Sequence, residues 1–259
     1  MALPQFAIII PACDEAPCIG QVLDEFVATV DLEKFVIAVG VNGSTDETAR
    51  IARERPVLVA ETQKRGYGHG CKAAIDLTNN LFPAIRSYIF CAADGATDPR
   101  DLHRLVAAYE QGYDFVLGSR TRRLRKWPTM TLRHLFANAA LGLWCSALCG
   151  RAYSDLGPLR LISRRLFEKI ALQEMTFGWT IEAQIAAARL GASICEIPVH
   201  ERRRVAGEQK VSGVTWRRTL SVGCQILAAG ERTRRNFQPA AAPSRTLVAP
   251  PAGTRQREA

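Results

Sequence analysis

Short apolar runs alternate with amphipathic segments along the first half of the chain. Runs typical of buried strands cover residues 6–11, 35–41, 56–60, 87–92 and 114–117. Segments with helical spacing of apolar positions lie at 17–29, 66–78 and 98–110, and Ser44-Thr-Asp-Glu47 has the spacing of a capping box that opens a further helix. Strands interleaved with helices predict an α/β fold with a mostly parallel central sheet and helices on both faces.

The pattern becomes mixed after Gly118. We expect a basic loop, an apolar helix, a turn, two helices, a strand and a last helix, over residues 120–126, 135–149, 154–158, 163–172, 179–189, 193–199 and 214–229. The apolar helix is shorter than the roughly 20 residues that a membrane span needs, and Asn138 and Ser146 interrupt it. The pattern therefore predicts a buried or interfacial helix there.

The length of the chain suits one substantial core, so we expect a single domain over residues 1–236. Residues 237–259 are rich in Pro, Ala and Arg, a composition that cannot bury a core, and we expect a disordered tail. Residues 6–10 are too short and lack a basic leader for a signal peptide. The eight cysteines include no Cys-x-x-Cys pair, which favours buried thiols of a reducing cytosol over a disulfide or zinc framework.

The formal net charge of +9 favours anionic partners. The cationic residues gather in three clusters, at 120–126, 202–204 and 232–235. A solvated face explains the first and third clusters equally well. Phosphate-bearing ligands and acidic membrane surfaces remain as partners, whereas nucleic acid is disfavoured because the clusters lack interleaved aromatic residues and a recognisable reading helix.

One carboxylate stands at the end of an apolar run, where Tyr88-Ile-Phe-Cys-Ala-Ala is followed by Asp94. A buried strand that ends in an acid is how an open α/β sheet presents a ligand for a metal or a phosphate. Ala92 stands where an Asp-x-Asp pair would have its first acid. Taken alone, Asp94 fits a structural cap as well as a site.

Other polar residues follow the remaining predicted strands. Glu15 follows the first strand and could hold a ribose or a base, and Asn42 follows the second and can pair with a nucleobase edge. The basic, glycine-dense loop 64–70 enters a helix, as a phosphate site requires. Its Gly-x-Gly-x-Gly spacing differs from the dinucleotide fingerprint, so a Rossmann dehydrogenase is disfavoured. Each motif alone is more often a cap or a surface loop.

Together and in order, the motifs resemble a known family. Ile-Ile-Pro-Ala-Cys-Asp-Glu, Asn-Gly-Ser-Thr-Asp, Arg-Gly-Tyr-Gly, Ala-Asp-Gly, Gly-Ser-Arg and Asp-Leu-Gly-Pro-Leu-Arg are similar to motifs of family-two glycosyltransferases with the GT-A fold. The nearest branch is that of dolichyl-phosphate mannose synthase-like and bacterial polyprenyl-phosphate enzymes, and the resemblance spans about residues 6–216. It implies an inverting transfer of a sugar from a UDP- or GDP-sugar to a polyprenyl phosphate or similar lipid-linked acceptor.

The resemblance also implies a division of the domain, with a donor-binding half at about 1–120 and an acceptor half at about 121–236. The implied donor-binding residues are Pro11, Cys13, Glu15, Asn42, Arg65, Asp94, Arg204 and Lys210. The implied acceptor-binding residues are Asp155, Arg160 and Arg204. The implied catalytic residues are Asp94, Asp155 and Glu182, with Asp94 as the ligand of Mg²⁺ or Mn²⁺.

Three positions depart from the family pattern, because Val41, Ala92 and Ala96 stand where the family commonly has polar groups. One protein oxygen with diphosphate and water could still hold Mg²⁺, weakly. Alternatively Arg204, Lys210 and Arg65 stabilise the leaving diphosphate without a metal.

Two other readings of the function stay open. The acceptor could be a saccharide or another soluble molecule, or the chain could be a sugar-nucleotide-binding pseudoenzyme. A hydroxyl acceptor needs a base, for which Asp155 and Glu182 are candidates, whereas a lipid phosphate needs none. The basic clusters and the apolar helix predict a cytoplasmic protein at the inner face of an anionic membrane.

Overall fold

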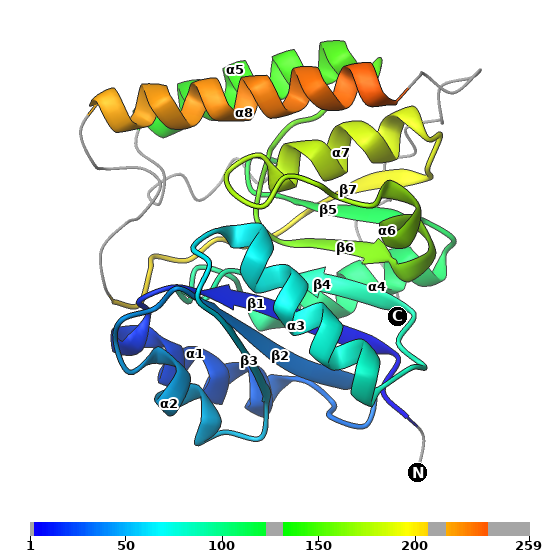
Figure 1. Cartoon of the computed structure of the whole chain (residues 1–259). Coiled ribbons are helices and arrows are strands. Elements are labelled where there is room, and N and C mark those ends of the chain that lie inside the picture. The colour runs from blue at the N-terminus through cyan, green and yellow to red at the C-terminus, as the bar shows by residue number, and fades with distance from the viewer. Residues whose placement is uncertain (1–2, 123–131, 207–215, 238–259) are drawn as a thin grey trace, which may run out of the picture.

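The computed structural model describes residues 3–122, 132–206 and 216–237. Four parallel strands form one side of its sheet (Figure 1). They are β1 (Phe6–Ala12), β2 (Phe35–Asn42), β3 (Leu58–Thr62) and β4 (Ser87–Phe90). All seven residues of β1 are buried, which is typical of a parallel strand covered on both faces.

The connecting segments of this half are mostly helical. They are α1 (Ala16–Thr29), α2 (Thr48–Arg53), α3 (Tyr67–Leu81), a 3₁₀ turn (Pro99–Asp101) and α4 (Leu102–Glu110). Asp98 caps the 3₁₀ turn, since its carboxylate accepts the Arg100 amide at 3.0 Å. The predicted capping box is wrong. Helix α2 begins only at Thr48, because the Ser44 hydroxyl instead accepts the amide of Asp14 at 2.9 Å.

The second half adds three strands, of which β6 was not predicted. The elements are β5 (Phe115–Ser119), α5 (Leu132–Cys149), β6 (Arg160–Ser163), α6 (Arg164–Ile170), α7 (Trp179–Arg189), β7 (Ile194–Pro198) and α8 (Trp216–Asn236). Strand β6 lies between β4 and β5 and runs antiparallel to both. The strand order is β3-β2-β1-β4-β6-β5-β7, and the predicted mostly parallel sheet is confirmed.

Helices cover both faces of the sheet, as predicted (Figure 1). Alternate residues of β1 enter different cores: Ile8 and Ile10 pack on the side of α1, α2 and α4, and Ile9 packs on the side of α3, α6 and α7. Helices α5 and α8 form an outer layer over α7. This arrangement brings the carboxyl ends of β1, β2 and β4 to one edge.

The apolar helix predicted at 135–149 is α5, and it is partly exposed. Cys145 faces the core, whereas Leu143 is 74% exposed. Among the residues that the structure describes, no helix has the length and apolar character needed to cross a membrane. The disordered tail predicted after residue 236 falls, apart from Phe237, outside the described residues.

Candidate active site

The loops after β1 and β2 carry several of the predicted donor residues. Pro11 and Asn42 are buried at the ends of these strands. Helix α3 approaches β2 so closely here that a Cβ on Gly70 would lie 2.7 Å from the Gly40 carbonyl oxygen and 2.8 Å from Asn42 Oδ1. The glycine-dense loop therefore serves the packing of α3 against β2, and the Asn42 side chain is confined between them.

Asp14 and Arg65 join two of these loops. Asp14 has a φ of 51°, and its carboxylate accepts the Thr45 amide at 2.7 Å and forms an ion pair with Arg65. The pKa of Asp14 is lowered, chiefly by the Thr45 hydrogen bond and to a smaller extent by the Arg65 charge, against the opposing effect of burial. Arg65 Nε also donates to the Gly43 carbonyl at 3.0 Å. Cys13 lies beside this turn, half-buried.

Arg204 joins the loops that follow β1 and β4. Its Nη2 contacts the buried Glu15 carboxylate, and its Nη1 lies 3.4 Å from Asp94 Oδ2. Burial lowers the pKa of Arg204, but the Glu15 hydrogen bond and the charges of Glu15 and Asp94 outweigh it and raise that pKa. Three residues that the sequence placed in the donor group thus form one cluster, although 189 positions separate Glu15 from Arg204.

The donor atoms around Asp94 do not fit a divalent cation. Asp94 Oδ1 accepts the amide of Ala96 at 3.0 Å, and Oδ2 faces the Arg204 guanidinium. Ala92 and Ala96 bring no side-chain oxygen, and the described part of the chain holds no group of three His, Cys, Asp or Glu side chains able to bind a metal. Mg²⁺ in such sites is bound by one or two carboxylates together with phosphate and water, whereas here the one carboxylate, Asp94, already faces a guanidinium. The predicted cation at Asp94 stays a prediction.

The predicted acceptor residue Asp155 is bound by Arg120. Its carboxylate accepts the Arg120 backbone amide, Nε and Nη2, each at 2.8 Å, and its side chain has no exposed surface. Arg120 Nη1 reaches Glu201 at 2.9 Å. Burial alone would lower the pKa of Arg120, but hydrogen bonds and charges from Asp155 and Glu201 outweigh burial, so the pKa is raised. In the sequence Arg120 belongs to a basic cluster and to the Gly-Ser-Arg motif, but no role in the site was predicted for it; its position directly after β5 was the available signal.

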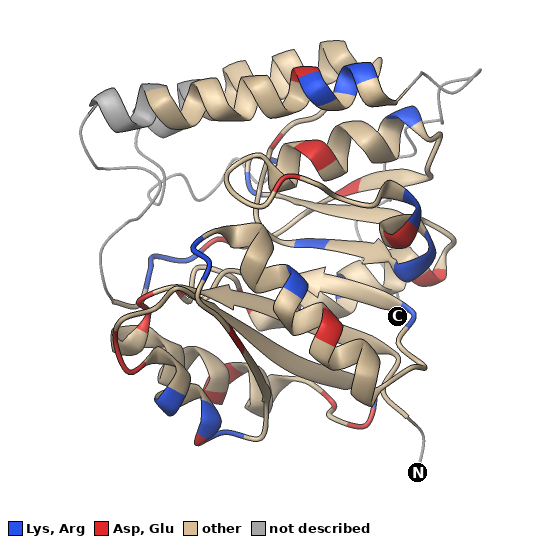
Figure 2. Ribbon diagram, in the orientation of Figure 1, with Lys and Arg blue, Asp and Glu red and all other residues tan. Residues whose placement is uncertain are grey.

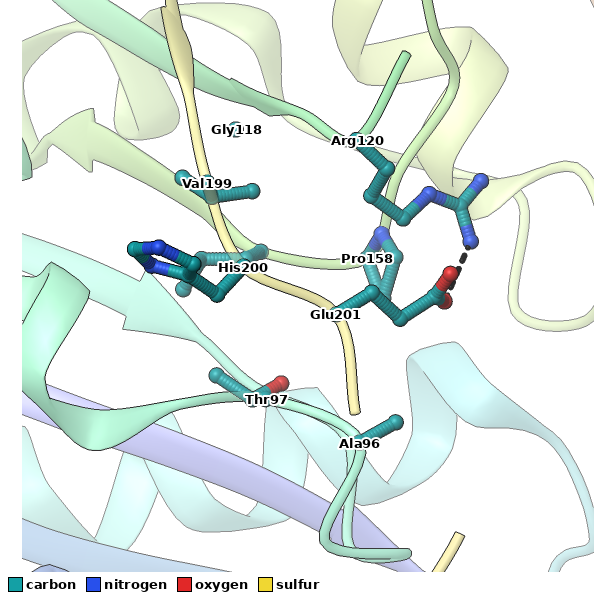
Figure 3. A pocket seen from close by; sticks show the side chains of 9 residues that line it. Ala96, Thr97, Gly118, Arg120, Pro158, Val199, His200 and Glu201 are labelled. Carbon is teal, nitrogen blue, oxygen red and sulfur yellow. Dashed lines mark hydrogen bonds and ion pairs between the residues drawn. The ribbon is translucent and has the colours of Figure 1, made fainter. Parts of the chain in front are cut away.

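A small cavity lies beside this network, between the turn at 96–97, the end of β5 and residues 199–201 (Figure 3). Arg120 and Glu201 face each other on one side of it, and His200 lies on the other. His200 Nδ1 is 3.2 Å from both carboxylate oxygens of Asp101. Each ionisable side chain named here thus faces an opposite charge or a carboxylate.

Arg160 and Glu182 hold loops in place. Arg160, at the start of β6, is buried and donates Nη1 to the Thr180 carbonyl at 3.0 Å; burial lowers its pKa. Glu182 accepts the backbone amides of Gln173 at 3.1 Å and Glu174 at 2.7 Å. Neither joins the Glu15–Arg204–Asp94 cluster through a contact that the structure shows. Lys210 lies outside the described residues.

Known proteins resemble this chain in sequence and in structure. A sequence profile described as glycosyl transferase family 2 matches residues 7–177, more than half of the chain. The chain belongs to glycosyl transferase family 2. The resemblance found in the motifs is thereby confirmed, and the protein is a glycosyltransferase.

Relatives with similar sequences carry related names. A dolichyl-phosphate hexose transferase of Haloferax volcanii is 30% identical over 206 residues, which cover 79% of this chain and 86% of that protein. A polyprenol monophosphomannose synthase of Mycolicibacterium smegmatis is 27% identical over 188 residues, which cover 70% and 69%. An uncharacterized glycosyltransferase of Mycobacterium tuberculosis is 28% identical over 174 residues, which cover 66% and 76%.

Solved structures share the fold. Glucosyl-3-phosphoglycerate synthase from Mycobacterium tuberculosis, crystallised with Mn²⁺, UDP and phosphoglyceric acid, aligns with a TM-score of 0.69. The alignment covers 92% of this chain and 80% of that protein at 17% identity. This similarity shows the GT-A fold, as the motifs predicted.

Proposed function

We propose that the protein transfers a sugar, with inversion at the anomeric carbon, from a nucleoside diphosphate donor to a polyprenyl phosphate or similar lipid-linked acceptor. The observation that carries the choice of acceptor is the state of the two candidate bases. Asp155 is fully engaged with Arg120, and Glu182 accepts backbone amides. The names of the relatives from Haloferax volcanii and Mycolicibacterium smegmatis agree with such an acceptor.

The chemistry follows from the charge of the acceptor. A phosphate monoester is mostly a dianion at neutral pH, because its second pKa is about 6. One of its oxygens attacks the anomeric carbon in line, the new carbon–oxygen bond forms, and the bond from that carbon to the donor's β-phosphate oxygen breaks. The nucleoside diphosphate leaves with the electron pair, and no proton has to be removed by the protein.

Roles for the donor side follow from position. Asn42, confined between β2 and α3, and Glu15 would contact the nucleoside, and Pro11 and Cys13 would line its pocket. Arg65 would lie beside the donor cleft, with Lys210 on the segment that follows Arg204. On the acceptor side, the Arg120 guanidinium would supply the positive charge for the acceptor phosphate. Asp155 positions that guanidinium, and Arg160 positions the loop around Gly157.

The test is transfer to a lipid phosphate. Purified protein is incubated with radiolabelled UDP- and GDP-sugars and a polyprenyl phosphate in detergent, and the chloroform-soluble label is counted. The matched control acceptor is the same polyprenol without its phosphate. We expect label in the lipid phase only with the phosphate. Transfer to the free alcohol or only to soluble saccharides would overturn the lipid-phosphate proposal, and donor binding without any turnover would favour the pseudoenzyme.

The acceptor also requires contact with a membrane surface, which we propose is the cytoplasmic face of an anionic bilayer. Exposed apolar residues on the outer helices support this: Ala139, Leu143 and Ala147 follow each other at four-residue spacing on α5, and Leu227 is exposed on α8. The net charge of +9 adds attraction to anionic lipid.

Flotation with vesicles tests this surface. We expect the protein to float with vesicles that contain phosphatidylglycerol and to stay below with pure phosphatidylcholine. Leu143→Asp should reduce the floating fraction, whereas Leu32→Asp, an exposed leucine in the loop between α1 and β2, should not. Equal flotation of both variants would reject α5 as the contact.

A further inference from the structure

The position of Arg204 is fixed by the chain around it. Residues 201–206 run along the loop that contains Asp94: the Arg202 amide donates to the Ala96 carbonyl at 2.9 Å, and the Val205 amide donates to the Asp94 carbonyl at 3.0 Å. Thr97 and Glu201 form a further antiparallel bridge. Arg204 is therefore held over Asp94 by backbone hydrogen bonds on both sides of it.

Side chains add to this attachment. The Arg202 guanidinium forms two contacts with the Glu25 carboxylate, at 2.5 and 2.8 Å, and donates to the Thr97 carbonyl at 2.8 Å. Gly95 has a φ of 77°, and a Cβ there would lie 2.4 Å from Val205 Cγ2. The 201–206 segment thus packs directly against the Asp94 loop, and its arginine is a fixed part of the site.

The charge at this point is already supplied by the chain. Arg204 stands between two carboxylates, and it has 18% of its side chain exposed. A divalent cation beside Asp94 Oδ2 would have to share that oxygen with the guanidinium at 3.4 Å, or displace it. Like charges at such a separation repel strongly, and more so where water is partly excluded.

We propose that Arg204 takes the place of a divalent cation on the donor diphosphate, so that this enzyme transfers sugar without a metal. The inference rests on the proposed function. A guanidinium suits a diphosphate because its donors form a planar fork that matches phosphate oxygens. On donor binding, the longer contact to Asp94 opens and Nη1 turns to a phosphate oxygen, while the Glu15 contact keeps the guanidinium in place.

The neighbouring chain adds positive charge on the same edge. Figure 2 shows Lys and Arg on the two segments that border it, residues 64–65 and 202–204. Contacts from Arg65 to Asp14 and from Arg204 to Glu15 bring both segments against the start of α1. A leaving diphosphate would therefore meet fixed cations, which stabilise developing negative charge without reorganisation.

The experiment measures donor binding and lipid transfer in EDTA and in Mn²⁺. For the wild type, we expect EDTA to change neither the binding of the UDP- or GDP-sugar, measured by calorimetry, nor the transfer of the sugar to the lipid. Arg204→Ala should lower kcat by about 100-fold, and Mn²⁺ should not restore it. Arg165→Ala, which removes an exposed arginine at the opposite edge of the sheet, is the matched control and should behave as wild type.

A double variant that replaces the arginine with a second carboxylate tests the same inference from the opposite direction. In the double variant, Arg204→Ala removes the competing cation and Ala92→Asp supplies a second carboxylate. This variant should therefore gain Mn²⁺-dependent donor binding. Wild-type binding or transfer that EDTA abolishes and Mn²⁺ restores would overturn the inference and leave the proposed function intact. If no lipid is labelled, donor binding decides: binding that persists in EDTA and is lost in Arg204→Ala supports Arg204, and binding that needs Mn²⁺ refutes it.

Discussion

Replacement of Asp155 by alanine separates a structural role from the catalytic role that the sequence suggested. The Asp155 carboxylate is inaccessible to solvent and accepts three hydrogen bonds from Arg120, each at 2.8 Å. Loss of one partner of a buried ion pair costs about 3–5 kcal/mol, because the other charge stays buried without its counter-ion. Glu201 still contacts Arg120 at 2.9 Å in Asp155→Ala, so we expect about 3 kcal/mol, the lower end of this range.

A second substitution measures the pair itself. If the cost of Asp155→Ala comes from the buried Arg120 charge, then Arg120→Met should relieve part of it. We expect the double variant to be more stable than the sum of the single variants predicts, with a coupling energy of about 1–3 kcal/mol. Urea unfolding followed by circular dichroism gives each free energy.

A surface pair provides the control. Asp24 forms a two-point ion pair with Arg55 at 3.0 and 3.1 Å, but its side chain is 60% exposed. Asp24→Ala should therefore lower the free energy of unfolding much less than Asp155→Ala does. If Asp155→Ala unfolds at the same urea concentration as wild type but no longer transfers sugar, the structural argument is refuted and the role of a general base is favoured.

Three further predictions concern other parts of the molecule. Glu182→Ala should lower the free energy of unfolding by about 1–3 kcal/mol because the buried carboxylate accepts the amides of Gln173 and Glu174, and Glu182→Gln should lose less; equal stability of both variants and wild type would contradict this. Gly40→Ala should cost about 1–3 kcal/mol, since its Cβ would lie 1.9 Å from the Gly70 carbonyl oxygen; an unchanged melting temperature would refute the close packing. Burial opposes ionisation of Asp114, but hydrogen bonds from Arg165, Ser193 and Ser163 lower its pKa below the ordinary 3.8. The contribution of this carboxylate to stability is therefore present above pH 3.8 and is lost as the pH falls through the lowered pKa. The loss of melting temperature on acidification should therefore be smaller in Asp114→Asn, and identical acid profiles would contradict the shift.

The sequence was sufficient to predict the fold class and the edge of the sheet at which several candidate residues gather. Continuous apolar runs separated by amphipathic helices permit little other than a covered, mostly parallel sheet, and parallel strands end at the same edge. Asp94 and Asn42 could therefore be placed at the same edge of the sheet from their positions after strands. Strand β6 was missed, because its four residues follow a turn and directly precede a helix, which leaves too little pattern to detect.

Only the tertiary structure decided which charges meet. The chain has 34 Lys and Arg and 25 Asp and Glu, and nothing local selects a pair among them when 189 positions separate Glu15 from Arg204. That contact depends on the backbone hydrogen bonds that attach residues 201–206 to the Asp94 loop. The sequence predicted Asp155 as a candidate base, whereas in the fold it is a buried partner of Arg120. An acid's chemistry is set by its burial and its partners, and long-range packing determines both.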